Sequence, residues 1–271
     1  MRTRYFILLL IAGWMKPGSI QAQKTSDTEP RKNEISASLN YQSVLHYFGR
    51  TDSLRSSGLF PMLNLQSKWG VYAQGTVVFV QNKALPLQYT GSLLEAGYRF
   101  KQTEHFAGNI FYTGIFYKDN SVVVQSALRG QTGFNASYLN KVVNINTGMD
   151  LKFSDHTDLG LTLGIDHLFL VHSGSSPVAF AADPSAYIYA GSRQFTETYI
   201  NKNGPLGLPA QTTATVNKLQ VLSYEFSVPL VLVAGNFNAS VTPAYTLPMS
   251  LLPEENGKNL FTVTLSMGVK F

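Results

Sequence analysis

The sequence predicts an all-β chain: a single antiparallel up-and-down transmembrane β-barrel of about ten strands, within a range of roughly eight to twelve. Three observations predict it: an alternating C-terminal strand, an export-like apolar segment near the N-terminus, and a series of further alternating segments. Charged residues make up only 14% of the chain, and its mean hydropathy is near zero. This composition is expected when half of each strand faces lipid and half faces a polar lumen.

Residues 261–271 form the clearest strand. Small or polar side chains alternate there with apolar ones, namely Phe261, Val263, Leu265, Met267, Val269 and Phe271. Because side chains on a strand alternate between its faces, one face is wholly apolar and the other polar. The segment resembles the C-terminal signal strand of bacterial outer-membrane barrels, which ends in Phe and is read by the barrel-insertion machinery. We expect it to close the barrel against the first strand, near residues 35–41.

The N-terminal residues have the layout of a secretory signal peptide. Arg2 and Arg4 precede an apolar run over residues 5–14, and Ala22 supplies a small residue for cleavage. The run is about half the length of roughly 20 residues that a transmembrane helix needs. Since only helices and closed barrels span lipid, a membrane-bound form of this chain is expected to be a barrel. The predicted organisation is a signal peptide over residues 1–22, a polar periplasmic leader over 23–33, and a barrel over 34–271.

Alternating segments follow one another along the barrel region. They cover residues 35–42, 59–66, 69–79, 94–100, 106–117, 143–153, 159–166, 222–232 and 237–242, before the C-terminal strand. A hairpin around Asn140 would raise the strand count to twelve. Residues 46–48, His-Tyr-Phe, are expected to belong to an interfacial aromatic belt.

The connections alternate in length, as they do in outer-membrane barrels, which have short periplasmic turns and longer outside loops. Short turns are expected at residues 67–68, 101–105, 154–158 and 235–236, and longer connections at 49–58, 82–86, 171–213 and 250–259. Both termini are therefore expected on the periplasmic side. The connection at about 171–213 is expected to be a long extracellular loop, with the option of its own hairpin near residues 186–190.

The signal ending at residues 21–23, the strand pair 224–229 and 243–248, and the terminal Phe271 together resemble a known type of protein. The chain resembles a small outer-membrane β-barrel protein of the Bacteroidota type, porin-like and without an assigned function. The resemblance implies a location in the cell outer membrane of a Gram-negative bacterium, after cleavage near Ala22. It implies a fold but no particular chemistry.

Charged side chains on the polar faces are expected to line the lumen. By the phase of each strand they are Glu95, Arg99, Asp150, Lys152, Asp166, Glu225 and Lys270. Both signs are present, and small barrels are filled by their own side chains. We therefore expect ion pairs that narrow the lumen, because burying such charges singly is costly.

The expected function is a narrow porin-like channel or a structural and interaction scaffold, and not an enzyme. One alternative is a lipid hydrolase at the barrel rim, using a Ser/His pair near His167 and His172, beside Ser173 and Ser175. The other is a soluble periplasmic barrel that binds lipid. The cluster of ionisable residues over 155–158 is expected in a solvated periplasmic turn.

No cofactor or metal is expected, because the chain has no cysteine and its His and carboxylate residues lack the spacing of a metal site. The expected partners are outer-membrane lipid, the barrel-insertion machinery through the C-terminal strand, and a protein partner at the extracellular loops. Nucleic acid is not expected, since the charge of +5 is spread thinly and forms no basic stripe.

Overall fold

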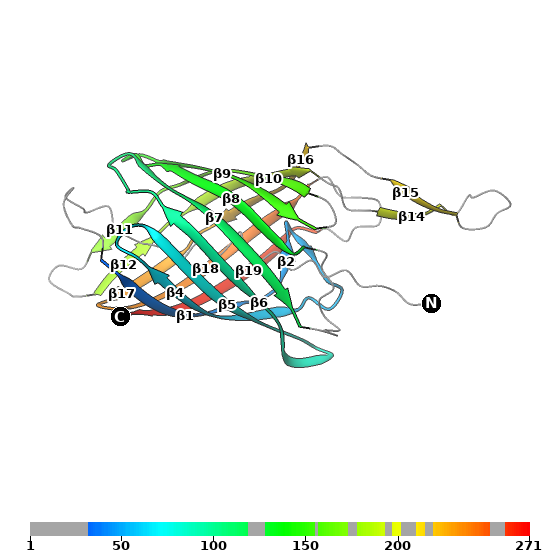
Figure 1. The fold of residues 1–271 in the computed structure, drawn as a ribbon, viewed down its shortest axis with the longest axis horizontal. Coiled ribbons are helices and arrows are strands. Elements are labelled where there is room, and N and C mark those ends of the chain that lie inside the picture. The colour runs from blue at the N-terminus through cyan, green and yellow to red at the C-terminus, as the bar shows by residue number, and fades with distance from the viewer. Residues whose placement is uncertain are drawn as a thin grey trace.

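A computed structural model describes residues 32–118, 128–154, 157–172, 178–192, 197–201, 210–214, 219–249 and 258–271. Twelve antiparallel strands form a closed ring (Figure 1). In ring order they are β1 (Glu34–Gln42), β4 (Ser57–Gln66), β5 (Val71–Asn82), β6 (Leu85–Arg99), β7 (Phe106–Tyr117), β8 (Gly130–Tyr138), β9 (Asn144–Phe153), β10 (Thr157–Asp166), β13 (Ser185–Ser192), β16 (Leu219–Ser227), β18 (Phe237–Pro248) and β19 (Leu260–Lys270).

The C-terminal strand closes the ring, as the sequence predicts. β19 pairs with β1 from Ser36 opposite Lys270 to Gln42 opposite Thr264. Beyond this ladder, the backbone N–H of Phe271 donates to the carbonyl oxygen of Ile35 at 2.8 Å. The start of β1 and the end of β19 therefore lie at the same end of the barrel, which we call the terminus end. The opposite end is called the loop end.

Three ring strands continue past short breaks toward the terminus end. β11 (Phe169–His172), β12 (Val178–Ala182) and β17 (Leu230–Ala234) extend β10, β13 and β16. Proline has no N–H to donate to a ladder, and Pro184 and Pro229 stand at two of the breaks. Single backbone bonds bridge the breaks, including one of 2.9 Å from the N–H of Asp183 to the carbonyl oxygen of Pro229. The wall therefore stays hydrogen-bonded through the interruption.

Two small hairpins stand apart from the ring ladders. β2 (His46–Tyr47) pairs with β3 (Arg50–Thr51), and β14 (Glu197–Asn201) pairs with β15 (Ala210–Ala214). The first connects β1 to β4, and the second belongs to the connection between β13 and β16. In Figure 1 β14 and β15 project beyond the loop end of the ring.

The expected count of about ten strands is wrong, because two strands, β8 and β13, lack a clear alternation of apolar and polar side chains. β8 carries large apolar side chains on its outer face only at Phe134 and Tyr138. β13 places Tyr187 and Tyr189 on its inner face, which hides the contrast between faces. The alternative with a hairpin around Asn140, which raises the expected count to twelve, is confirmed. β8 and β9 are joined there.

The extra strands also change which connections share an end. Residues 171–213 are not one loop, because they contain β12 and β13, which pair within the wall. β9 ends and β10 begins at the loop end rather than with the termini. His167 follows β10 and therefore lies toward the terminus end, opposite to the expected outer end.

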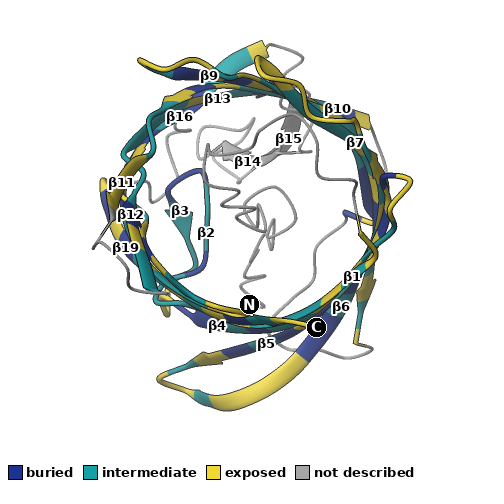
Figure 2. Ribbon diagram, turned by 90° about the vertical axis from the view of Figure 1, so that its left-hand side faces the viewer, coloured by how far each residue is buried: buried dark blue, intermediate teal, exposed yellow. Residues whose placement is uncertain are grey.

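The two faces of the wall differ in polarity along each strand. On β19, Phe261 is 59% exposed on the outside of the ring, whereas the neighbouring Thr262, on the inner face, is 2% exposed. Exposed residues alternate with less exposed ones around the ring (Figure 2). Among the described residues, no helix is long and apolar enough to cross a membrane.

Glycine at position 97 is required by close packing between β6 and β7. A Cβ there would meet the carbonyl oxygen of Ile110 and, at 2.7 Å, the ring of Tyr72. We expect Gly97→Ala to destabilise the barrel by about 1–3 kcal/mol, since neither backbone nor packed ring can give way freely. Gly75→Ala is the matched control, because its Cβ would meet only Leu94 at 3.6 Å. Urea unfolding of the refolded barrel measures both, and equal losses of stability would contradict this account.

Candidate functional site: the barrel lumen

The inner face of the wall is the candidate site, because it gathers polar side chains from strands that are far apart in sequence. Glu95 accepts hydrogen bonds from the hydroxyls of Tyr72, at 2.9 Å, and Thr113, at 2.8 Å. The Arg99 guanidinium lies 4.5 Å from the centre of the Tyr72 ring and donates to Oε1 of Gln66 at 2.6 Å. Two charged residues that the sequence assigns to the lumen, Glu95 and Arg99, thus belong to one network.

This network continues around the ring through amides. Nδ2 of Asn109 donates to the Tyr72 hydroxyl at 3.1 Å, and Nδ2 of Asn135 donates to Asn109 at 3.3 Å. The connected side chains span β4 to β8. Chains of hydrogen bonds polarise one another and hold their members rigidly, so this part of the wall is a fixed polar surface.

Asp150 and Lys152 form an ion pair on β9, with 2.5 Å between Oδ2 and Nζ. They are two residues apart on one strand and therefore share a face. Gly160 on β10 makes room for them, since a Cβ there would meet both Lys152 Nζ and the Asp150 carboxylate. Asp158 stands directly opposite Lys152 in the ladder. These three charged side chains therefore lie together on the inner wall near the loop end.

Asp166 organises a second polar group on β9, β10 and β13. It accepts hydrogen bonds from the amides of Asn144, at 2.7 Å, and Asn146, and from the Tyr187 hydroxyl at 3.5 Å. The hydroxyl of Ser137 donates to Asn146 at 2.6 Å. The carboxylate is thus held by neutral donors.

Glu225 is the most enclosed of the predicted lumen carboxylates, with 4% of its surface exposed. Thr246 on the neighbouring β18 donates to its Oε2 at 3.1 Å. Ser223, on the same face of β16, is fully buried, and its hydroxyl has no partner among the described residues. The inner wall at β16 and β18 is therefore polar, and it includes one buried hydroxyl without a partner among the described residues.

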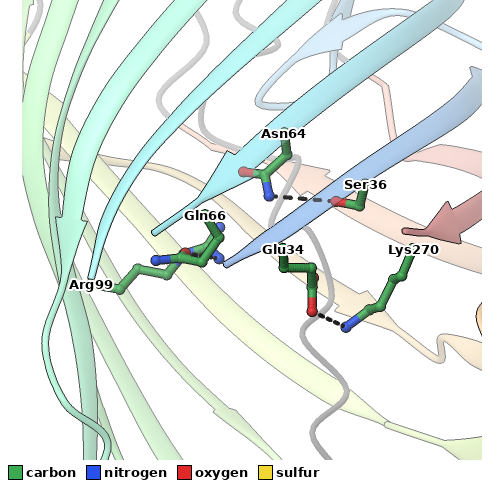
Figure 3. A network of polar contacts seen from close by, with 6 residues as sticks. All are labelled: Glu34, Ser36, Asn64, Gln66, Arg99 and Lys270. Carbon is green, nitrogen blue, oxygen red and sulfur yellow. Dashed lines mark hydrogen bonds and ion pairs between the residues drawn. The ribbon is translucent and has the colours of Figure 1, made fainter. Parts of the chain in front are cut away.

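Lys270 pairs with Glu34 across the closing strands at the terminus end, at 3.2 Å (Figure 3). Both side chains are well exposed, so the pair contributes little stability. Figure 3 shows it beside the Ser36–Asn64 and Gln66–Arg99 contacts on the same inner face. The predicted charged set is therefore distributed along the lumen rather than gathered at one point.

The sequence singled out charges and missed their neutral partners. Tyr72, Thr113, Asn144, Asn146 and Thr246 donate hydrogen bonds to the predicted carboxylates. The alternation along each strand was the available signal, because it puts these side chains on the same faces as the charges. The sequence did not show which strands are neighbours, and the neighbouring strand decides which side chain each carboxylate contacts.

The β2–β3 hairpin folds inside the outline of the ring (Figure 2). Its two-residue turn has positive φ at Phe48, 50°, and at Gly49, 80°, as a type I′ turn requires. The expectation that residues 46–48 belong to an interfacial belt is wrong, because Phe48 is buried against the inner wall, 5.3 Å from the Tyr189 ring. Gly49 lies against Pro248, and Arg50 donates to the carbonyl oxygen of Met249 at 2.8 Å.

His46 stabilises this turn as a neutral imidazole. The backbone N–H of Gly49 donates to its Nδ1 at 3.2 Å, so that nitrogen carries no proton. Burial lowers the pKa of His46 to about 4, well below its ordinary value. The hydrogen bond therefore persists at neutral pH.

An apolar cluster joins the root of the hairpin to the adjacent part of the wall. It contains the buried side chains of Leu45, Phe60, Val78, Val80 and Leu93. The last four lie on the inner faces of β4, β5 and β6 near the loop end. The sequence carried this signal, because both phases of these strands are apolar there: Val77 and Leu94 face outward next to the inward Val78 and Leu93.

The structure does not bring the residues considered for hydrolysis together within the part of the chain that it describes. The His167 ring packs edge-on against Phe169, with 4.5 Å between the ring centres. The side chain of His172, and residues 173–177 with both serines, lie outside the description, as do residues 155 and 156 and the predicted signal peptide. Among the described residues, no group of three or more His, Asp or Glu could hold a metal ion.

No protein-family model and no curated protein sequence matches this chain. Solved structures do. An outer membrane channel from Pseudomonas putida F1 superimposes with a TM-score of 0.52 at 12% identity, over 92% of this chain and 99% of that one. A KdgM porin (TM-score 0.48, 9% identity, 88% and 99% covered) and LpxR from Salmonella typhimurium (0.48, 8%, 86% and 99%) are also similar. At such identities the likeness to the channel shows the fold alone.

Proposed function

We propose that this protein is an outer-membrane β-barrel that forms a narrow channel for small polar solutes. The observation that carries the proposal is a closed twelve-strand ring with an apolar outer face and a polar, hydrogen-bonding inner face. Apolar-out and polar-in is the arrangement of barrels that lie in lipid around an aqueous interior. A soluble barrel has no reason to expose rings such as Phe106 and Phe261 on its outside.

The strand number supports a narrow passage rather than a wide pore. Barrels of about eight strands are filled by their side chains, and those of about sixteen leave an open channel. Twelve strands fall between these limits, and the polar networks at Glu95 and Asp166 occupy part of the interior. The fold shared with the Pseudomonas putida channel agrees with this proposal.

The proposal places the terminus end in the periplasm and the loop end outside the cell. The signal peptide would direct export and be cleaved near Ala22, and Phe271 would present the C-terminal strand to the barrel-insertion machinery. Outer-membrane lipid would contact the outer face, and the loops would be free to meet a protein partner. A Bacteroidota origin stays a prediction. The proposal assigns no cofactor and no catalytic step to this chain.

Conductance measures the proposed function directly. The full-length mature protein, refolded in detergent and shown to be folded by heat-modifiable gel migration, is added to planar lipid bilayers. We expect small discrete conductance steps that depend on the protein. Folded protein that inserts and stays silent would overturn the channel and leave a scaffold.

A further inference from the structure

We propose that the β2–β3 hairpin is the constriction of the lumen, and that it determines the largest solute that passes. The inference rests on the channel proposed above and adds to it the element that sets the size limit. It comes from where the hairpin is held, how its root is closed and what its tip contacts.

The hairpin is held at its root and at its tip by two different parts of the wall. At its root, Leu45 belongs to the apolar cluster with Phe60 of β4, Val78 and Val80 of β5 and Leu93 of β6. At its tip, Phe48 packs on Tyr189 of β13. The hairpin therefore projects into the lumen and occupies part of its cross-section (Figure 2).

The root of the hairpin is closed by hydrogen bonds. The carboxylate of Asp52 accepts from the N–H of Ser56 at 2.8 Å and from its hydroxyl at 2.6 Å. Leu45 N–H donates to the Ser56 carbonyl oxygen at 2.7 Å, and Asn82 donates to the Ser56 hydroxyl at 3.1 Å. These contacts tie the hairpin to β4 and β5. The β2–β3 hairpin is therefore fixed to the wall at its root.

The tip is positioned by Phe48. An aromatic residue with positive φ costs about 1–3 kcal/mol, and such a conformation persists only where its surroundings require it. Here the surroundings are Tyr189 beside the ring of Phe48, Pro248 against Gly49, and the Met249 carbonyl oxygen bound by Arg50. The contacts with β13 and β18 offset the backbone strain and hold the tip inside the ring.

The test removes the hairpin and measures the pore. Residues 46–55 are replaced by an Asn-Gly turn, which joins Leu45 to Ser56 across their existing backbone bond. We expect single-channel conductance to rise roughly two-fold or more, because the lumen regains its full cross-section. Polyethylene glycols of graded size, used as neutral blockers, should enter at larger sizes than in the unaltered barrel. Phe48→Ala, which keeps the chain length, should give a smaller increase of the same kind.

The matched control removes residues 197–214, the β14–β15 hairpin, with the same turn, and should leave conductance and size limit unchanged. An unaltered protein that conducts, with unchanged size limits in the excised and the Phe48→Ala barrels, would overturn this inference and leave the channel intact. A folded and inserted unaltered protein that is silent would overturn the proposed channel itself, and with it the inference that rests on the channel.

Discussion

Leu265→Arg is expected to prevent stable insertion of the barrel into membranes. Leu265 is exposed on the outer face at the middle of β19, between Tyr41 of β1 and Val241 of β18 in the ladder. An Arg at the middle of a lipid-facing strand costs about 2–4 kcal/mol. The cost falls on the strand that closes the ring, so assembly and final stability should both suffer.

The measurement is the folded fraction after refolding into lipid vesicles, and the amount of protein in the outer membrane of a Gram-negative host. Ser266→Arg is the matched control, because the next residue of the same strand has an inner-face side chain. It should refold much better than Leu265→Arg. Equal recovery of Leu265→Arg and the unaltered protein, or its appearance in the soluble periplasm, would contradict the membrane location.

Glu95→Leu is expected to destabilise the barrel by about 2–4 kcal/mol. The substitution removes the acceptor for the hydroxyls of Tyr72 and Thr113 and the negative charge that attracts the Arg99 guanidinium. Two hydroxyls that lose their acceptor, together with the lost charge attraction, cost more than the gain from an apolar side chain. The outer face is untouched, so insertion itself should remain efficient.

Urea unfolding in lipid vesicles measures the loss, and Glu95→Gln is the conservative control. The amide keeps one acceptor oxygen for a hydroxyl, so about half the loss or less should remain. A double-mutant cycle with Thr113→Val gives the coupling between the two side chains. A coupling near zero, or a Leu variant as stable as the Gln variant, would show that the network does not hold the wall.

The alternation of single strands made the barrel predictable from sequence. β19 needed only its own residues to be recognised, because every second side chain from Phe261 to Phe271 is apolar. β8 and β13 failed the same criterion: the outer face of β8 is poor in large apolar residues, and the inner face of β13 carries tyrosines. Missing β8 placed β9 and β10 in the wrong direction until the second missed strand, β13, restored the parity, so His167 was assigned to the wrong end.

The lumen was predictable in kind but not in detail. Phase alone indicated which charges share the inner faces, and Asp150 with Lys152 could be paired because they lie two residues apart on one strand. Glu95 with Tyr72 or Glu225 with Thr246 could not be paired, because their contact depends on which strands are neighbours and in which register.

The sequence by itself determined that the C-terminal strand is amphipathic, that it closes against the first strand, and that the chain is all-β. These follow from side-chain alternation, which is a local property of extended backbone. Only the tertiary structure decided that the ring has twelve strands, and that residues 46–51 turn into it. Both depend on contacts between distant segments: Phe48 finds Tyr189 only after β1 and β13 stand in one closed wall.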